Sequence, residues 1–286
     1  MQPQSRTLLN LTLMIVFATL AERACDGQQV QARQASSVIA RASTEPDTSQ
    51  IDAAIKLAQE SLQHLQDNVN DYTALFVKRC RVNGELPPVQ YARVKIRNRK
   101  NKDGTTAIPL SVYLNFLKPA SVQGREVIWV EGRNDGKMVV HDTGIGGLIN
   151  INLDPNGALA MRGQRYPITD IGIENLVRKM IETGIRDRQY GECNVQFFEN
   201  AKIGKVTCMM LQVTHPIKRD HFDFYQARLY FDQNLKVPIR YESWSWPTTP
   251  GGKPVLEEEY MYLQLAVNVG LSDQDFDIGN PNYRFR

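Results

Sequence analysis

Two hydrophobic periodicities divide the chain into strand-like and helix-like parts. Over most of the sequence beyond residue 70, apolar and polar side chains alternate with a period of two, as in half-buried strands. Connections of a few residues, rich in Asn, Asp, Gly and Pro, separate these segments and require antiparallel neighbours. Ten strands are predicted in this way, over residues 71–79, 89–99, 108–117, 125–132, 137–142, 194–200, 205–215, 222–232, 237–246 and 255–268.

Two segments instead show the spacing of an amphipathic helix, with apolar residues on one face. The first starts near Ser49, and its apolar face consists of Ile51, Ala54, Ile55, Ala58, Leu62, Leu65 and Val69. The second covers residues 170–184, where we expect Asp170 to cap the helix, Glu174 to pair with Arg178 and Gly184 to end it. Its apolar face consists of Ile173, Leu176, Val177, Met180 and Ile181.

The order helix, five strands, helix, five strands predicts an α+β fold. A twisted antiparallel sheet of about ten strands tends to curl, and its dry concave face must then be covered. We therefore expect an unclosed half-barrel with the N-terminal helix and the 170–184 helix on the concave face. The second helix is then either a fixed part of the core or a movable lid over a ligand.

The N-terminal region has the features of an export signal. Arg6 precedes an apolar run from Leu8 to Leu20, which is shorter than a typical transmembrane helix. Small residues near its end, Thr19 and Ala21, suit a cleavage site. We predict a signal peptide over residues 1–21, a flexible linker over 22–48 and a single domain over 49–286. The protein is thus expected in the periplasm or cell envelope. An uncleaved anchor, or lipidation at Cys25, are the alternatives.

Composition narrows the class of partner. Hydrophobic residues make up 42% of the chain, enough for a large core, while 34 Lys and Arg balance 31 Asp and Glu. The charges form no long basic run, so nucleic acid is not an expected partner.

The cysteines suggest disulfides rather than metal binding. An oxidising compartment permits disulfides, and no CxxC spacing occurs. Cys193 and Cys208 flank a hairpin-like segment centred near Asn200, which makes them a candidate pair. The mature chain retains four cysteines with three pairings, and the sequence does not choose among these.

Other polar motifs do not indicate catalysis, a metal or a cofactor. His215 and His221 lack the spacing of a metal-binding pair and fit a loop. No G-x-S-x-G elbow is present. Glu257, Glu258 and Glu259 begin a strand in which alternation turns Glu258 away from the other two, and we interpret them as a solvated outer face. We therefore expect no enzyme activity.

The tryptophans are candidate walls for a cavity. Trp244 and Trp246 share one face of their strand, and Trp129 lies in another predicted strand. On a concave face they would line an apolar cavity, and on a convex face they would form an exposed patch.

Several stretches resemble a bacterial domain-of-unknown-function family (1571). They are LNFLKPASVQGREVIWVEGRNDGK (114–137), LDPNGALAMRGQRYPITDIGIENL (153–176) and VGLSDQDFDIGNPNYRF (269–285). The element order is also similar to LolA/LolB-like periplasmic lipoprotein carriers, in which an unclosed barrel holds an apolar cavity under a helical lid.

This resemblance implies a carrier-like protein that binds the acyl chains of a lipid or lipoprotein, or another apolar ligand. Our candidate binding residues, taken from the apolar helix face and the strand alternation, are Ile173, Leu176, Val177, Met180 and Ile181, with Trp129, Trp244 and Trp246 as candidate walls. Envelope proteins or a membrane surface are further implied partners. The alternative is a structural or protein-interaction module of the cell envelope, with a closed core and no ligand.

Overall fold

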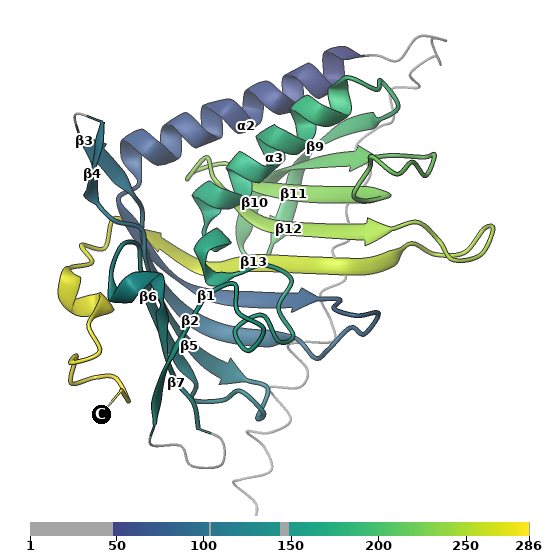
Figure 1. The fold of residues 1–286 in the computed structure, drawn as a ribbon. Coiled ribbons are helices and arrows are strands. Elements are labelled where there is room, and N and C mark those ends of the chain that lie inside the picture. Colours follow the sequence, from purple (N-terminus) through teal and green to yellow (C-terminus); the bar gives the residue numbers. More distant parts are fainter. Residues whose placement is uncertain (1–47, 103, 144–148, 286) are drawn as a thin grey trace, which may run out of the picture.

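Two helices lie on one side of a large curved sheet in the computed structural model (Figure 1), which describes residues 48–102, 104–143 and 149–285. The helices are α2 (Thr48–Asn68) and α3 (Ile173–Arg188). The predicted signal peptide, Cys25 and the linker up to residue 47 lie outside the described residues. Within the described residues, α2 begins at Thr48, the last residue of the predicted linker.

All ten predicted strands are present, together with three short ones that the pattern did not predict. The predicted strands are β1 (Asp71–Cys80), β2 (Gln90–Arg97), β5 (Ser111–Lys118), β6 (Glu126–Val130), β7 (Met138–His141), β9 (Asn194–Ile203), β10 (Val206–Thr214), β11 (Gln226–Asp232), β12 (Pro238–Ser245) and β13 (Val255–Val267). The additional strands are β3 (Lys100–Lys102), β4 (Thr105–Ile108) and β8 (Asn150–Leu153).

Within the described residues the main sheet has eleven strands, in the order β8-β7-β6-β5-β2-β1-β13-β12-β11-β10-β9, and every pairing is antiparallel. β3 and β4 form a separate hairpin. The sheet does not close, because β8 and β9 are its two edges and do not pair. The α+β half-barrel prediction is therefore confirmed.

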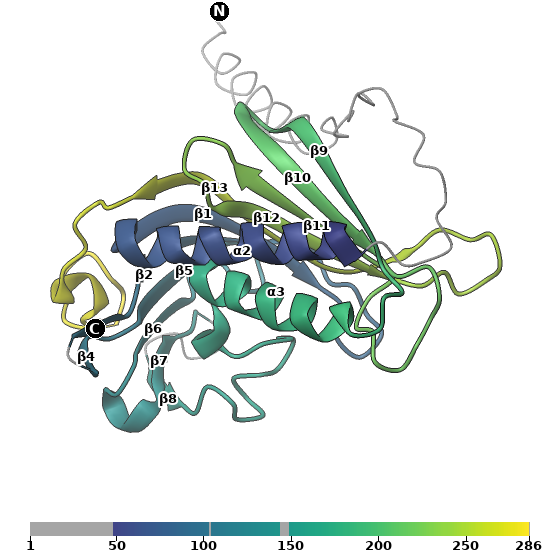
Figure 2. The same cartoon turned by 90° about the horizontal axis from the view of Figure 1, so that it is seen from above.

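This topology determines where α3 lies. β8 and β9 follow one another in sequence but lie at opposite edges of the sheet. The connection between them must therefore cross the sheet, and it does so over the concave face, where α3 runs beside α2 (Figure 2).

The two helices are antiparallel and pack closely. Arg188 at the end of α3 pairs with Asp52 near the start of α2, with Nε 2.6 Å from Oδ1. A Cβ atom on Gly184 would lie 3.0 Å from Cγ1 of Ile55. Gly184 is therefore a point of close approach between the helices, and it lies inside α3 instead of ending it as predicted.

The start of α3 also differs from the prediction. The helix begins at Ile173, and Asp170 belongs to a preceding 3-10 turn, η2 (Ile168–Asp170). No side chain of the helix itself caps it. Instead, the Tyr72 hydroxyl of β1 accepts the Ile173 backbone N–H at 2.9 Å. The predicted pair on the outer side is confirmed, with Arg178 Nη2 2.7 Å from Glu174 Oε1.

The C-terminal tail, which reads as a loop, packs on the convex face. A 3-10 turn, η3 (Asp273–Phe276), and the residues after it form a second apolar cluster with β5 and β6. Tyr283 stacks on Tyr113 with ring centroids 4.1 Å apart. Both faces of the sheet in this half are thus covered.

The predicted disulfide between Cys193 and Cys208 is wrong, because both thiols are free. The hairpin turns after Ile203, not near Asn200, which has φ 61° beside an irregularity in the strand pairing. Cys208 therefore lies close to the turn, opposite Ala201, whereas Cys193 precedes the first residue of β9 at the open end. Burial raises the pKa of each thiol to about 11, which keeps both protonated near neutral pH.

Candidate functional site

A cavity of about 1440 Å³ lies between the concave face of the sheet, the two helices and residues 155–172. It exceeds the roughly 300–1,000 Å³ that is typical of sites for drug-sized ligands. Much of its wall is apolar. The apolar lining includes Ile51, Ala54 and Ala58 from α2, Phe76, Leu114, Phe116, Val127, Met138 and Val140 from one half of the sheet, and Leu211, Val213, Ala227 and Leu229 from the other.

The structure divides the predicted α3 residues between the cavity and the core. Leu176 and Met180 line the cavity and are half-buried. Ile173 and Val177 do not line it; they are 1% and 0% exposed and belong to the main hydrophobic core. Ile181 packs against that core as well. Part of the face that the sequence assigns to a ligand thus holds the helix in place.

None of the three tryptophans is among the cavity-lining residues. Trp129 is buried in the main core, and its Nε1–H donates to the Gly136 carbonyl at 3.1 Å. Trp244 lies under the guanidinium of Arg228, 5.1 Å from the ring centroid. Trp246 donates from Nε1 to the His215 carbonyl at 3.0 Å. The alternation of β12 explains this placement, because Tyr241 and Ser243 are its cavity-lining residues.

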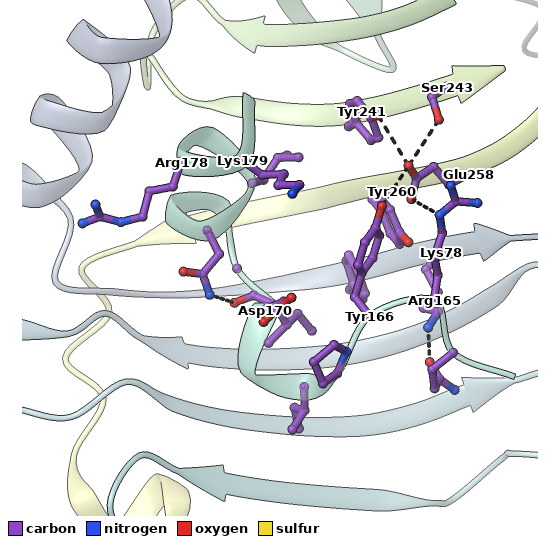
Figure 3. Close-up of a pocket in the computed structure, with 18 of the residues that line it drawn as sticks. Lys78, Arg165, Tyr166, Asp170, Arg178, Lys179, Tyr241, Ser243, Glu258 and Tyr260 are labelled. Carbon is purple, nitrogen blue, oxygen red and sulfur yellow. Dashed lines mark hydrogen bonds and ion pairs between the residues drawn. The ribbon is translucent and has the colours of Figure 1, made fainter. Parts of the chain in front are cut away.

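Glu258 forms a polar centre in the cavity wall (Figure 3). The carboxylate is buried, and its Oε1 accepts hydrogen bonds from the hydroxyls of Tyr166, Ser243 and Tyr241 at 3.2, 3.3 and 3.4 Å. Burial raises the pKa of Glu258, while the nearby Arg165 acts in the opposite direction. The interpretation of residues 257–259 as a solvated outer face is therefore wrong for Glu258, which lines the cavity.

Arg165 connects the segment before α3 to the sheet. Its Nε lies 3.6 Å from Glu258 Oε2, and its Nη1 lies 3.3 Å from Glu257 Oε2. Its neighbour Tyr166 adds the hydroxyl contact to Glu258, and burial raises the pKa of this tyrosine to about 12. These contacts hold residues 165 and 166 against β13 across the cavity.

Lys78 is a second polar feature of the wall. It lines the cavity from β1, and its amine donates to Oε1 of Gln164. Burial lowers its pKa. Among the described residues, no carboxylate forms an ion pair with this amine.

Both ends of α3 are attached to the sheet half-barrel. The Tyr72 contact holds the first residue, and near the other end Asp187 Oδ2 lies 3.3 Å from Nε2 of the buried His215. His215 Nδ1 donates to the Phe224 carbonyl at 3.0 Å, since a carbonyl only accepts. Arg186 adds a pair with Asp223 at 2.9 Å. α3 is thus a wall of the cavity that is attached near both of its ends.

Sequence patterns missed Lys78, Glu258 and Arg165. A lysine or glutamate in a strand is normally interpreted as facing water. Lys78 and Glu258 lie under the helices only because β1 and β13 are at the centre of the sheet. The LDPNGALAMRGQRYPITD motif that precedes α3 was the available signal, because it contains Gln164, Arg165 and Tyr166.

The chain belongs to the family described as Protein of unknown function (DUF1571), which matches residues 69–285. The family resemblance in the sequence is thereby confirmed. No curated protein matches the sequence.

Solved structures similar to the chain share little sequence with it. The lipoprotein LppX from Mycobacterium tuberculosis is 13% identical, with a TM-score of 0.43, over 79% of this chain and 100% of its own. A LolA superfamily protein from Nitrosomonas europaea is 13% identical, with a TM-score of 0.31, over 77% and 97%. MucB from the Pseudomonas aeruginosa MucA/MucB complex is 15% identical, with a TM-score of 0.43, over 79% and 60%.

Two general features of the described chain bear on the kind of site. No three His, Cys, Asp or Glu side chains in the described ranges are grouped so as to hold a metal ion. In the same ranges, neither helix combines the length and the apolar character needed to cross a membrane.

Proposed function

We propose that this protein is an exported, non-enzymatic binding protein for an acyl-bearing or other apolar ligand, carried in the half-barrel cavity. The observation that supports this most directly is the cavity itself, which is large and mostly apolar in its deep wall. Cavities that stay open in a folded protein are costly unless something fills them, because protein interiors otherwise pack at the density of organic crystals.

The division of the α3 residues supports a ligand that shares its apolar surface with a fixed helix. Ile173 and Val177 hold α3 on the sheet, while Leu176 and Met180 offer apolar surface to the cavity. Burial of such surface contributes about 25 cal/mol per Å². Binding would thus proceed by apolar burial with few polar contacts.

Two substitutions that introduce the same charge on adjacent residues test this proposal. Leu176→Asp places a carboxylate in the cavity, so we expect loss of uptake of a neutral fluorescent apolar probe with the fold preserved. Val177→Asp places it in the core, so we expect loss of the folded state by circular dichroism. Ile185→Asp is the matched control, because Ile185 is 48% exposed on the same helix; it should preserve both properties.

Native mass spectrometry of the full chain, purified without detergent, provides an independent measurement. A co-purified mass that Leu176→Asp removes supports the proposal. A wild-type protein that carries no ligand and takes up no probe would overturn it. That result would favour the alternative, an envelope structural or protein-interaction module.

A further inference from the structure

The Lys78 side chain faces the inside of the cavity and not bulk water. β1 lies between β2 and β13 near the middle of the sheet, and Lys78 is paired in register with Gln90 on one side and Tyr260 on the other. Phe76, two residues earlier on the same face, also lines the cavity. Figure 3 shows the Lys78 side chain beside the Tyr260 ring and Arg165. An ammonium group is thus held in the cavity wall, with the Tyr260 ring and the Arg165 side chain beside it.

Lys78 lacks the carboxylate partner that Arg125 and Arg165, two other cations of the cavity wall, have. Arg125 lines the same cavity and lies 2.7 Å from Asp142. Arg165 lies 3.3 and 3.6 Å from Glu257 and Glu258. Lys78 has three donor hydrogens and, among the described residues, only the neutral carboxamide of Gln164 as a hydrogen-bond partner. Burying an ammonium without an anion is costly, so this position favours a ligand that supplies one.

Lys78 keeps donor hydrogens for such a ligand, because its hydrogen bond to Gln164 Oε1 uses only one of the three. Glu258 does not neutralise Lys78, because Arg165 and three hydroxyls already surround its carboxylate. Of the two cations in this part of the wall, Arg165 thus has carboxylate partners, whereas Lys78 has none among the described residues.

We propose that Lys78 binds the anionic head of a single-chain amphiphile, a carboxylate or a phosphate, whose hydrocarbon chain occupies the apolar part of the cavity. This inference rests on the proposed function and specifies its ligand. From Lys78, the hydrocarbon chain of the ligand would pass Phe76 toward the apolar walls formed by β5, β6 and β7. A charge-assisted hydrogen bond in a site of low polarity is strong enough to select the anionic head over a neutral one.

The structural alternative is that Lys78 only tethers residues 155–172 to the sheet through Gln164. Three variants separate the two roles. Lys78→Met removes the charge and the tether, Gln164→Met removes the tether and keeps the charge, and Lys78→Arg keeps a cation. Circular dichroism establishes that each variant is folded before binding is measured.

The experiment is displacement of a neutral fluorescent apolar probe from delipidated full-length protein by hexadecanol, hexadecanoate or hexadecyl phosphate. We expect the wild type to prefer the anionic amphiphiles over hexadecanol by at least about tenfold. Lys78→Met should abolish this preference, whereas Gln164→Met and Lys78→Arg should retain it. Hexadecanoate and hexadecyl phosphate distinguish the two head groups by their relative affinity. Acetate and inorganic phosphate alone should displace no probe.

Preservation of the preference in Lys78→Met, or an equal loss in Gln164→Met, would overturn the inference. If acetate or inorganic phosphate displaced the probe at the same concentrations as the amphiphiles, the proposed role of the hydrocarbon chain would be overturned. Equal binding of hexadecanol and hexadecanoate to the wild type would overturn the anionic site and leave the proposed function intact. Failure of every amphiphile and of the probe to bind would instead overturn the proposed function.

Discussion

The hydroxyl of Tyr72 on β1 lies 2.9 Å from the backbone nitrogen of Ile173 and accepts its N–H. A helix start leaves four such donors without partners inside the helix, and a capping side chain from the preceding residues normally satisfies one of them. Here the preceding residue is Gly172, which has no side chain and φ 118°. The sheet supplies the cap, so the position of α3 is coupled to the core of the half-barrel.

Loss of this hydroxyl should loosen α3. We predict that Tyr72→Phe lowers the free energy of unfolding by about 1–3 kcal/mol, since a buried N–H loses its acceptor. Hydrogen exchange should increase most at the first turn of α3. Tyr283→Phe is the control, because its hydroxyl donates to the Asp275 carbonyl at 2.9 Å on the convex face. Equal exchange at α3 in both variants would contradict the capping role.

The contact between Gly184 and Ile55 should be visible as a coupling between two substitutions. Ala is favoured over Gly inside a helix by about 1 kcal/mol, but a Cβ at residue 184 would lie 3.0 Å from Ile55 Cγ1. We therefore predict that Gly184→Ala stabilises the protein in an Ile55→Ala background and gives less or no gain with Ile55 present. Urea unfolding of the four proteins in the cycle measures this. Additive effects would mean that the helices separate freely at this point.

The buried Glu258 carboxyl should make stability depend on pH. Its pKa in the folded protein is raised by burial, whereas about 4.3 is expected in the unfolded chain. A raised pKa means that the contribution of this group is fully present below the unfolded value and is lost as pH rises through the folded one. Glu258→Gln should therefore gain stability relative to the wild type as pH increases over that interval. Chemical unfolding at pH 4 and pH 8 tests the sign, and a constant difference would contradict it.

The convex-face packing of the tail should contribute substantially to stability. Phe276 is 3% exposed in the cluster with Tyr113 and Ile128, whereas Ile278, two residues later, is 45% exposed. We predict that Phe276→Ala lowers the free energy of unfolding by about 3–5 kcal/mol. Ile278→Ala should change it little. If both variants unfold at the same denaturant concentration as the wild type, the tail is not part of the folded core.

Local patterns were sufficient for the ten predicted strands and both helices, because each has a regular alternation or a continuous apolar face. They missed β3, β4 and β8, which have three or four residues each, and β4 and β8 contain no buried residue. A short, exposed strand has no hydrophobic pattern to read, and only pairing with a neighbour makes it a strand. The tail was missed for a related reason, since its aromatic residues follow no period.

The candidate site was predictable only in part. Leu176 and Met180 were found because they belong to an apolar helical face, but that face also contains Ile173 and Val177, which the sheet covers. The direction in which Trp244 points depends on which face of β12 is concave. The proposed disulfide failed because the position of the hairpin turn, at Gly204 and Lys205, decides which residues of β9 and β10 are opposite.

The sequence by itself determined the two half-buried helices, ten of the strands and their antiparallel pairing, because period and turn chemistry are local properties. The tertiary structure alone decided that the connection from β8 to β9 crosses the concave face. That crossing brings Gln164 into contact with Lys78, 86 positions away in the chain, and Arg165 into contact with Glu258, 93 positions away. Their meeting depends on the strand order of the whole sheet, and no local pattern encodes that order.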